Sequence, residues 1–234
     1  RPTDIGDPSS GSGDNYTIDA YNNFQVHTPA DLIPFGTSIK IAYAPDLDTY
    51  GSGNASGVVD TLSSTNIGDS ATEVQLKVTE IPMADGLTLG ASYFEFDGDF
   101  MAKTAQAAES GAYYATYASG PFTVGYSQAY KAVNLADHAT TALTDTTVEH
   151  YDQNNYSIAY AATDDLSISY EVENDEVNYV TAATAEVEQK SKSIQVAYTM
   201  GGMTLAVAHG SYDNVGYVND VNIDQTLFAV TMAF

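Results

Sequence analysis

Apolar and polar residues alternate along most of the chain, and helical spacing is almost absent. In LTLGASYFEF (87–96), Leu87 and Leu89 fall on one face, and Thr88 and Gly90 fall on the other. Such alternation predicts strands with one apolar face. The same pattern predicts ten further strands: YNNFQVHTP (21–29), TSIKIAYAP (37–45), TEVQLKVTEI (72–81), GAYYATYAS (111–119), FTVGYSQAY (122–130), NYSIAYAAT (155–163), LSISYEVEN (166–174), KSIQVAYTM (192–200), MTLAVAHG (203–210) and VNIDQTLFAVTMAF (221–234).

The connections between these strands form two sets that alternate along the chain. One set is short: MADG, SGP, TDD, GG and, as the longest, ADLIPFG. The other set is long and polar, as in KAVNLADHATTALTDTTVEH, NDEVNYVTAATAEVEQK and YDNVGYVND. An up-and-down meander has two rims, so this pattern predicts tight turns at one rim and loops at the other.

The faces of the predicted strands favour a membrane barrel over a soluble β-sandwich. The polar faces carry small uncharged residues instead of the Lys and Glu of a solvated sheet. Tyr117, Tyr160 and Tyr198 each lie two to four residues before a short turn. Aromatic rings with one polar end suit a membrane–water interface. In a sandwich, loop lengths need not alternate, and Greek-key crossings would interrupt the order of strands.

Composition narrows the class further. The 234 residues are 44% hydrophobic, which suits one large domain, and no run of 18 apolar residues predicts a membrane-spanning helix. The first residue is not Met, so either a leader has been removed or the sequence begins inside a longer protein. There is no Cys and no Trp, which excludes disulfides and thiolate chemistry. The net charge of −24 argues against nucleic-acid binding and favours cations.

The final strand carries a family resemblance. TLFAVTMAF (226–234) places Phe228, Val230, Met232 and Phe234 on one face. A sheet in lipid must close on itself, so its last strand must be complete, with apolar side chains facing lipid. A terminal strand of this kind, ending in Phe, resembles the C-terminal signature of Gram-negative outer-membrane β-barrels. The hairpins YATYASGPFTVGYSQAY, SIAYAATDDLSISYEVE and QVAYTMGGMTLAVAHG resemble those of general diffusion porins, from about residue 17 onward.

This resemblance implies an all-β, antiparallel up-and-down transmembrane barrel over 17–234, with short periplasmic turns and long extracellular loops. It also implies a passive, non-enzymatic channel for small hydrophilic solutes, a homotrimer, and contact with outer-membrane lipid and lipopolysaccharide. Family barrels have an even number of strands with both ends on the periplasmic side. About eleven strands would put residue 1 on the extracellular side, so we expect a fragment of a 16-stranded barrel that lacks about five N-terminal strands.

The segment RPTDIGDPSSGSGDNYTID precedes what would be the sixth strand. It resembles, in position and acidity, the family loop that folds into the barrel and narrows the pore; residues 1–16 would form it. Asp4, Asp7 and Asp14 would be its carboxylates, facing basic residues on the opposite wall. Arg1 is the only arginine, a departure from the family that leaves the selectivity open. The alternative is a solvated acidic loop, because short Asp-rich segments are common in loops.

Alternation assigns further charges to the barrel interior. Lys40 and Lys77 fall on the face opposite the large apolar residues, and so do Glu171 and Glu173 near the extracellular mouth. Glu95 is a weaker candidate. Interior charges tune permeation at little folding cost, because that face is wet. An acidic channel concentrates cations, so we expect a cation-favouring pore.

Other chemistry finds little support. The four histidines, His27, His138, His150 and His209, do not have metal-ligand spacing. No G-x-S-x-G is present, so a hydrolase nucleophile elbow is not indicated. The acidic clusters at 46–48, 97–99 and 174–176 could hold Ca²⁺ at the outer rim, but solvated surface charge is the simpler interpretation. No cofactor is expected.

Three alternatives to a general porin remain. A substrate-specific channel would carry aromatic side chains in its lumen, for which Tyr114 and Tyr130 are candidates. A surface adhesin or phage-receptor barrel would have long loops and a plugged lumen without conductance. A soluble secreted β protein would stay in water without detergent.

Overall fold

The eleven predicted strands form one antiparallel sheet, in which each strand pairs with its neighbours in sequence. The computed structural model describes residues 16–18, 23–29, 32–45, 70–97, 104–106, 108–133, 135–136, 148–180 and 185–232. The strands of the sheet are β1 (Phe24–His27), β2 (Ser38–Ala44), β3 (Ser70–Val78), β4 (Leu87–Asp97), β6 (Glu109–Ser119), β7 (Phe122–Ala132), β9 (Val148–Ala161), β10 (Leu166–Tyr179), β11 (Val187–Met200), β12 (Met203–Asp213) and β13 (Ile223–Met232).

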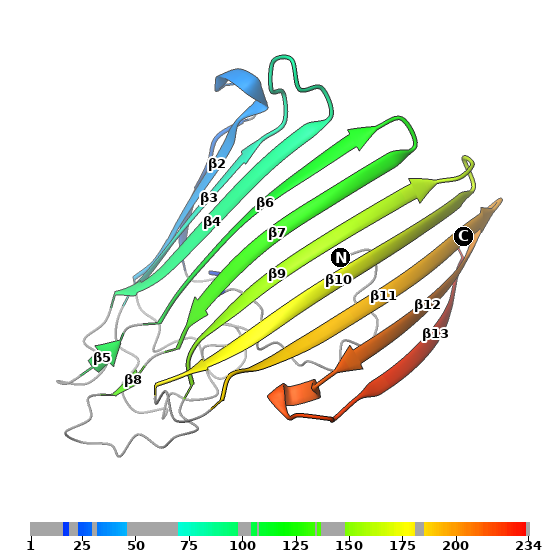
Figure 1. The fold of residues 1–234 in the computed structure, drawn as a ribbon. Coiled ribbons are helices and arrows are strands. Elements are labelled where there is room, and N and C mark those ends of the chain that lie inside the picture. The colour runs from blue at the N-terminus through cyan, green and yellow to red at the C-terminus, as the bar shows by residue number, and fades with distance from the viewer. Residues whose placement is uncertain are drawn as a thin grey trace.

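The sheet is a curved up-and-down meander with β1 and β13 at its edges (Figure 1). Within the described residues these two edges do not pair, so the sheet is open. The hairpins β6–β7, β9–β10 and β11–β12 turn at the same rim, the upper one in Figure 1. β13 ends at that rim as well, because Met232 pairs with Met203 beside the turn between β11 and β12. The predicted two-rim arrangement is confirmed.

Several strands extend further than predicted. β10 continues to Tyr179 and β11 begins at Val187, so most of the segment expected as a long loop is strand. Likewise β9 begins at Val148 and β12 reaches Asp213. Two short strands, β5 (Thr104–Gln106) and β8 (Leu135–Ala136), pair outside the main sheet and were not predicted. The added strand segments are polar on the convex face, as at Glu176 and Asn178, so the apolar stripe that marks the rest of each strand is missing there.

The two faces of the sheet differ in chemistry. Ladder partners share a face, so the pairing assigns every regular strand residue to one side. The convex face carries large apolar side chains that are exposed, such as Phe122, Ile158 and Val196. The concave face carries mainly Ser, Thr, Asn, Gln, Ala and Gly. This arrangement is the reverse of a water-soluble fold, whose large apolar residues turn inward.

Tight turns at the upper rim depend on glycine. In the two-residue turn between β11 and β12, Gly201 has φ +61°. Gly120, which opens the turn between β6 and β7, has φ +57°. A positive φ at the first turn residue but not at the second belongs to the type II′ hairpin, whose twist matches that of paired strands.

A buried apolar cluster lies on the concave side, near the rim opposite the tight turns. Its members are Tyr16, Ile18, Ala42, Ala44, Ala71, Phe94, Phe96 and Ala108. The cluster joins residues 16–18 to β2, β3 and β4. Within the described ranges, no helix is long and apolar enough to cross a membrane.

Candidate functional site

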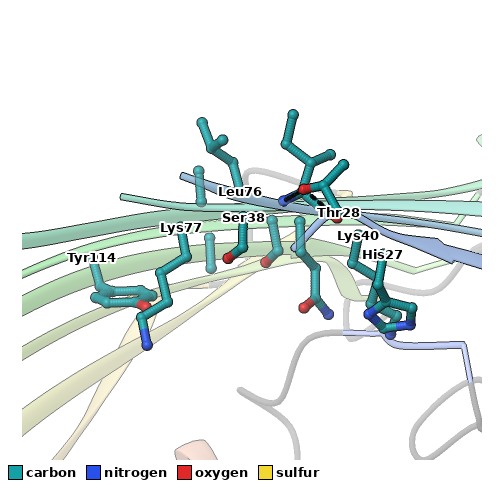
Figure 2. Close-up of a pocket in the computed structure, with 12 residues that line it drawn as sticks. His27, Thr28, Ser38, Lys40, Leu76, Lys77 and Tyr114 are labelled. Carbon is teal, nitrogen blue, oxygen red and sulfur yellow. Dashed lines mark hydrogen bonds between the residues drawn. The ribbon is translucent and has the colours of Figure 1, made fainter. Parts of the chain in front are cut away.

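A basic wall lies on the concave face of β1, β2 and β3. Lys40 pairs directly with His27, and Lys77 lies two residues from Gln75, the other partner of Lys40. Because this spacing keeps side chains on one face, the two lysines and His27 point the same way. Figure 2 shows these three side chains directed to one side of the sheet and Leu76 to the other. They line an open cavity of about 440 Å³.

Tyr114 borders this cavity from β6 (Figure 2). Its ladder partner is Gly90 on β4, which also pairs with Lys77. A Cβ atom at Gly90 would overlap with Cε1 of Tyr114, so the ring occupies the space that the glycine leaves free. Tyr114 is therefore on the interior face, where its position in the strand predicted it.

Glu73 interacts with the basic wall, although no motif or spacing in the sequence singles it out. Its carboxylate lies 3.4 Å from the ammonium group of Lys40 and also accepts a hydrogen bond from the Gln75 amide. The residue is only 2% exposed. Alternation places Glu73 on the face of Lys77, four residues further along β3, but only the fold shows which groups meet there.

Residues 16–18 cross the concave face without regular secondary structure. The backbone N–H of Tyr16 donates to Oγ of Ser110 on β6 at 3.0 Å. The backbone N–H of Ile18 donates to Oε2 of Glu73 at 2.9 Å, and the Thr17 hydroxyl lies 3.3 Å from both oxygens of the same carboxylate. Two side chains of the concave face, Ser110 and Glu73, thus accept hydrogen bonds from backbone N–H groups that are not part of any strand ladder.

The Tyr16 ring is packed between an aromatic ring and a cation. Its centroid lies 5.4 Å from that of Phe94, and Nζ of Lys131 lies 4.8 Å from it. Burial, with a smaller contribution from Tyr151, raises the pKa of the Tyr16 hydroxyl above its ordinary value. The neutral ring presents its face to the ammonium group, a favourable cation–π geometry.

An acidic row runs along the concave face of β10: Glu171, Glu173 and Asp175 at every second position. Amides of β9 contact it, since Gln153 donates to Glu173 at 2.8 Å and Asn155 reaches the carboxylates of both Glu171 and Glu173. Successive carboxylates are spaced by about 7 Å along the strand. The row therefore places three carboxylates and two amide side chains on one stretch of the inner surface.

Asp175 and Lys131 are interior charges that the sequence did not reveal. The predicted strands ended at Asn174 and Tyr130, one residue short of each. Asp175 is 2% exposed and Lys131 is 5% exposed. Continuing the alternation by one residue would have placed both on the inner face, but the polar surroundings gave no sign that the strands went on.

Two expected interior positions are wrong. Glu95 pairs with Glu109 on the convex face, and the Tyr93 hydroxyl donates to that partner at 3.0 Å. Tyr130 is also convex, and its ring centroid lies 5.2 Å from that of His150. Each residue lies eight positions after a convex apolar residue, Leu87 and Phe122 respectively, so strict alternation keeps it outside.

The convex face carries the expected aromatic and C-terminal residues. Tyr117, Tyr160 and Tyr198 all lie there, close to tight turns and more than a third exposed. Phe228, Val230 and Met232 are convex and 77%, 59% and 55% exposed. The remaining member of that signature, Phe234, lies outside the described residues, as do four residues of the expected constriction segment: Arg1, Asp4, Asp7 and Asp14.

The described residues contain no group of three or more His, Asp or Glu side chains arranged to hold a metal ion. In the 174–176 cluster, Asp175 faces inward while its neighbours face outward, so the three cannot converge. The clusters at 46–48 and 98–99 lie outside the described residues, as does His138. His150 and His209 lie on the convex face, beside Asp152 and Thr226 respectively.

Comparison with known proteins identifies the fold. No protein-family model and no curated protein matches the sequence. A porin structure refined at 1.8 Å resolution is similar with a TM-score of 0.53 over 89% of this chain and 60% of its own, at 14% identity. OmpT, an outer membrane protein of Vibrio cholerae, is similar with a TM-score of 0.51 over the same shares, at 12% identity. The chain has the fold of an outer-membrane porin barrel.

The porin fold confirms the expected all-β, up-and-down architecture. The chain spans 60% of the length of either solved structure, and the eleven strands described in its main sheet leave that sheet open. At these identities the likeness concerns the fold.

Proposed function

We propose that the protein is a porin of the bacterial outer membrane, through which small hydrophilic solutes and ions diffuse passively. The observation that carries this proposal is the reversal of polarity in a porin-like sheet, with exposed apolar side chains on the convex face and polar ones on the concave face. Lipid solvates the first surface and water the second. Such a channel needs no catalytic group, only a wet path.

The acidic row supports a preference for cations. The concave face of the described strands carries three lysines, and the positive charge of one of them, Lys40, is neutralised by its ion pair with Glu73. The carboxylates of Glu171 and Glu173 lie together on one strand, and Asp175 is buried beside them. Like charges in a confined passage concentrate counter-ions, so cations should be admitted preferentially.

The in-folded segment supports a size limit. Residues 16–18 are held on the concave face, so this part of the chain lies inside the curve of the sheet. This placement fits a constriction formed by residues 1–16, with Asp4, Asp7 and Asp14 as its charges. The same proposal has the eleven strands as part of a larger closed barrel, assembled as a homotrimer among lipid and lipopolysaccharide.

The first experiment is single-channel recording of the membrane-inserted protein in a planar bilayer with a salt gradient across it. We expect large conductance steps in groups of three and a reversal potential of cation sign. Absence of conductance from correctly inserted protein would contradict the porin proposal and favour a plugged receptor or adhesin barrel.

Selectivity provides a matched test on one strand. The double substitution Glu171→Gln and Glu173→Gln should reduce the cation-to-anion permeability ratio about twofold or more, because it removes two charges from the passage. Glu176→Gln makes the same kind of change on the convex face of β10 and should leave the ratio unchanged. An equal shift per charge removed in both variants would show that the net charge of the whole protein sets selectivity, and not the acidic row.

A further inference from the structure

We infer that Glu73 is a positioning residue, which fastens residues 16–18 to the inner wall of the barrel. Its carboxylate meets that segment through two donors, the Ile18 backbone N–H and the Thr17 hydroxyl. It meets the wall through two more, the side chains of Lys40 and Gln75. One carboxylate therefore joins β2, β3 and the in-folded segment.

Burial separates this role from that of a charge facing the passage. Glu73 is 2% exposed, so solutes have little access to its carboxylate. Hydrogen bonds to an ionised acceptor are about twice as strong as neutral ones. A buried carboxylate needs such partners, and here half of its donors come from residues at least 55 positions away in sequence. Removing Glu73 would leave the Ile18 N–H without an acceptor inside the barrel.

The remaining contacts of the segment make it depend on Glu73. Among the described residues, Tyr16 is held by Ser110, Phe94 and Lys131, whereas the polar contacts of Thr17 and Ile18 both go to Glu73. Without that carboxylate, the segment keeps one anchored end at Tyr16 and loses the other. An effect on permeation rests on the proposed function: in a channel, detached residues 16–18 would change the open cross-section of the passage.

Cysteine labelling tests the fastening without relying on conductance. The chain contains no cysteine, so a single Ile18→Cys variant reports only on that position. Ile18 is 6% exposed, and a membrane-impermeant maleimide should label its replacement slowly. In an Ile18→Cys/Glu73→Ala variant we expect labelling at least about tenfold faster. Losing hydrogen bonds to a charged acceptor increases by about that factor the population of molecules in which residues 16–18 are detached from the sheet. Tyr114→Cys, on the exposed inner wall, should label equally fast with and without Glu73.

Two milder variants test the same contact if the Glu73→Ala protein folds poorly, as judged by its migration on unheated gels. Glu73→Gln retains an acceptor but removes the charge, and Thr17→Val removes one donor while leaving every charge in place. Both should accelerate labelling of Ile18→Cys, by less than Glu73→Ala. Equal protection of Ile18→Cys in all backgrounds, or rapid labelling with Glu73 intact, would overturn the inference.

Single-channel currents then test whether the attachment of residues 16–18 affects the channel. Thr17→Val should increase open-channel current fluctuations in the same direction as Glu73→Gln. If Glu73 acted only as a passage charge, Thr17→Val would leave the current unchanged, which would contradict positioning. If the unmodified protein does not conduct at all, the proposed function fails, whereas the labelling experiment still decides on Glu73.

Discussion

At the scale of single residues, the alternation of side chains along a strand decides whether a residue lies on the convex or the concave face. Asp175 is buried on the concave face, whereas Glu176, the next residue, lies on the convex face. The same alternation separates Val196, which is exposed on the convex face, from Ala197 on the concave face. Neighbours in sequence therefore meet two different solvents, lipid and water, if the sheet spans a membrane.

A pair of lysine substitutions tests whether the two faces of the sheet meet different solvents. Val196→Lys should lower the free energy of unfolding in lipid vesicles by about 2–4 kcal/mol, because a cation near the middle of the bilayer face is poorly solvated. Ala197→Lys places the same side chain on the wet face and should change it by less than about 1 kcal/mol. Urea titration of the vesicle-inserted variants measures both values. Equal losses would indicate that both faces are in water or both are packed in protein.

At the scale of elements, the sequence predicted every strand of the main sheet because each carries an apolar stripe towards the tight turns. Beyond that stripe the convex face of the strands is polar, as at Asn174 and Glu176, so their true ends were hidden. Residues 16–18 were even less accessible to prediction. Their placement depends on Glu73 and Ser110, which are distant in sequence and marked by no spacing.

The turn between β11 and β12 allows a test at this scale. Gly201 has a positive φ, and a Cβ added there would have nothing within 4 Å, so Gly201→Ala meets conformational strain and no steric clash. Its cost should be about 1–3 kcal/mol, the penalty of holding an L-residue in a sparsely populated conformation of positive φ. Gly202→Ala, in the next position and without a positive φ, should cost less than about 1 kcal/mol. Folding into vesicles, followed by gel mobility, compares the two. A larger loss for Gly202→Ala would exclude the type II′ turn.

At the scale of the whole molecule, ladder partners on successive strands form rows across the sheet. The border between apolar and polar side chains on the convex face runs obliquely to these rows. The unbroken run of apolar and aromatic convex residues that starts at the tight turns ends at Tyr126 on β7, where Tyr130 stands alone beyond Gln128, and at Phe228 on β13. The row of Phe228 passes through Phe122, so the border shifts by four residues, about 13 Å, along the strand. It does so over five strand spacings of about 4.8 Å each. The ratio gives a strand tilt of roughly 30°, near the range of membrane barrels.

If the sheet spans a membrane, this tilt makes one row of the sheet pass from lipid into water. The row contains Val124, Ile158, Tyr170, Ile194, His209 and Thr226. At a tilt of roughly 30°, its two ends differ in height by about 12 Å. A nitroxide on Val124→Cys should therefore lie within the hydrocarbon, accessible to oxygen, and one on Thr226→Cys should lie at the aqueous interface, accessible to a nickel chelate. A label on Gln128→Cys, the first polar convex position of β7, should match the depth of the label at Thr226→Cys. Equal depths at 124 and 226 would mean that the strands stand upright, and the polar residues of β12 and β13 would then have to face a protein partner instead of water.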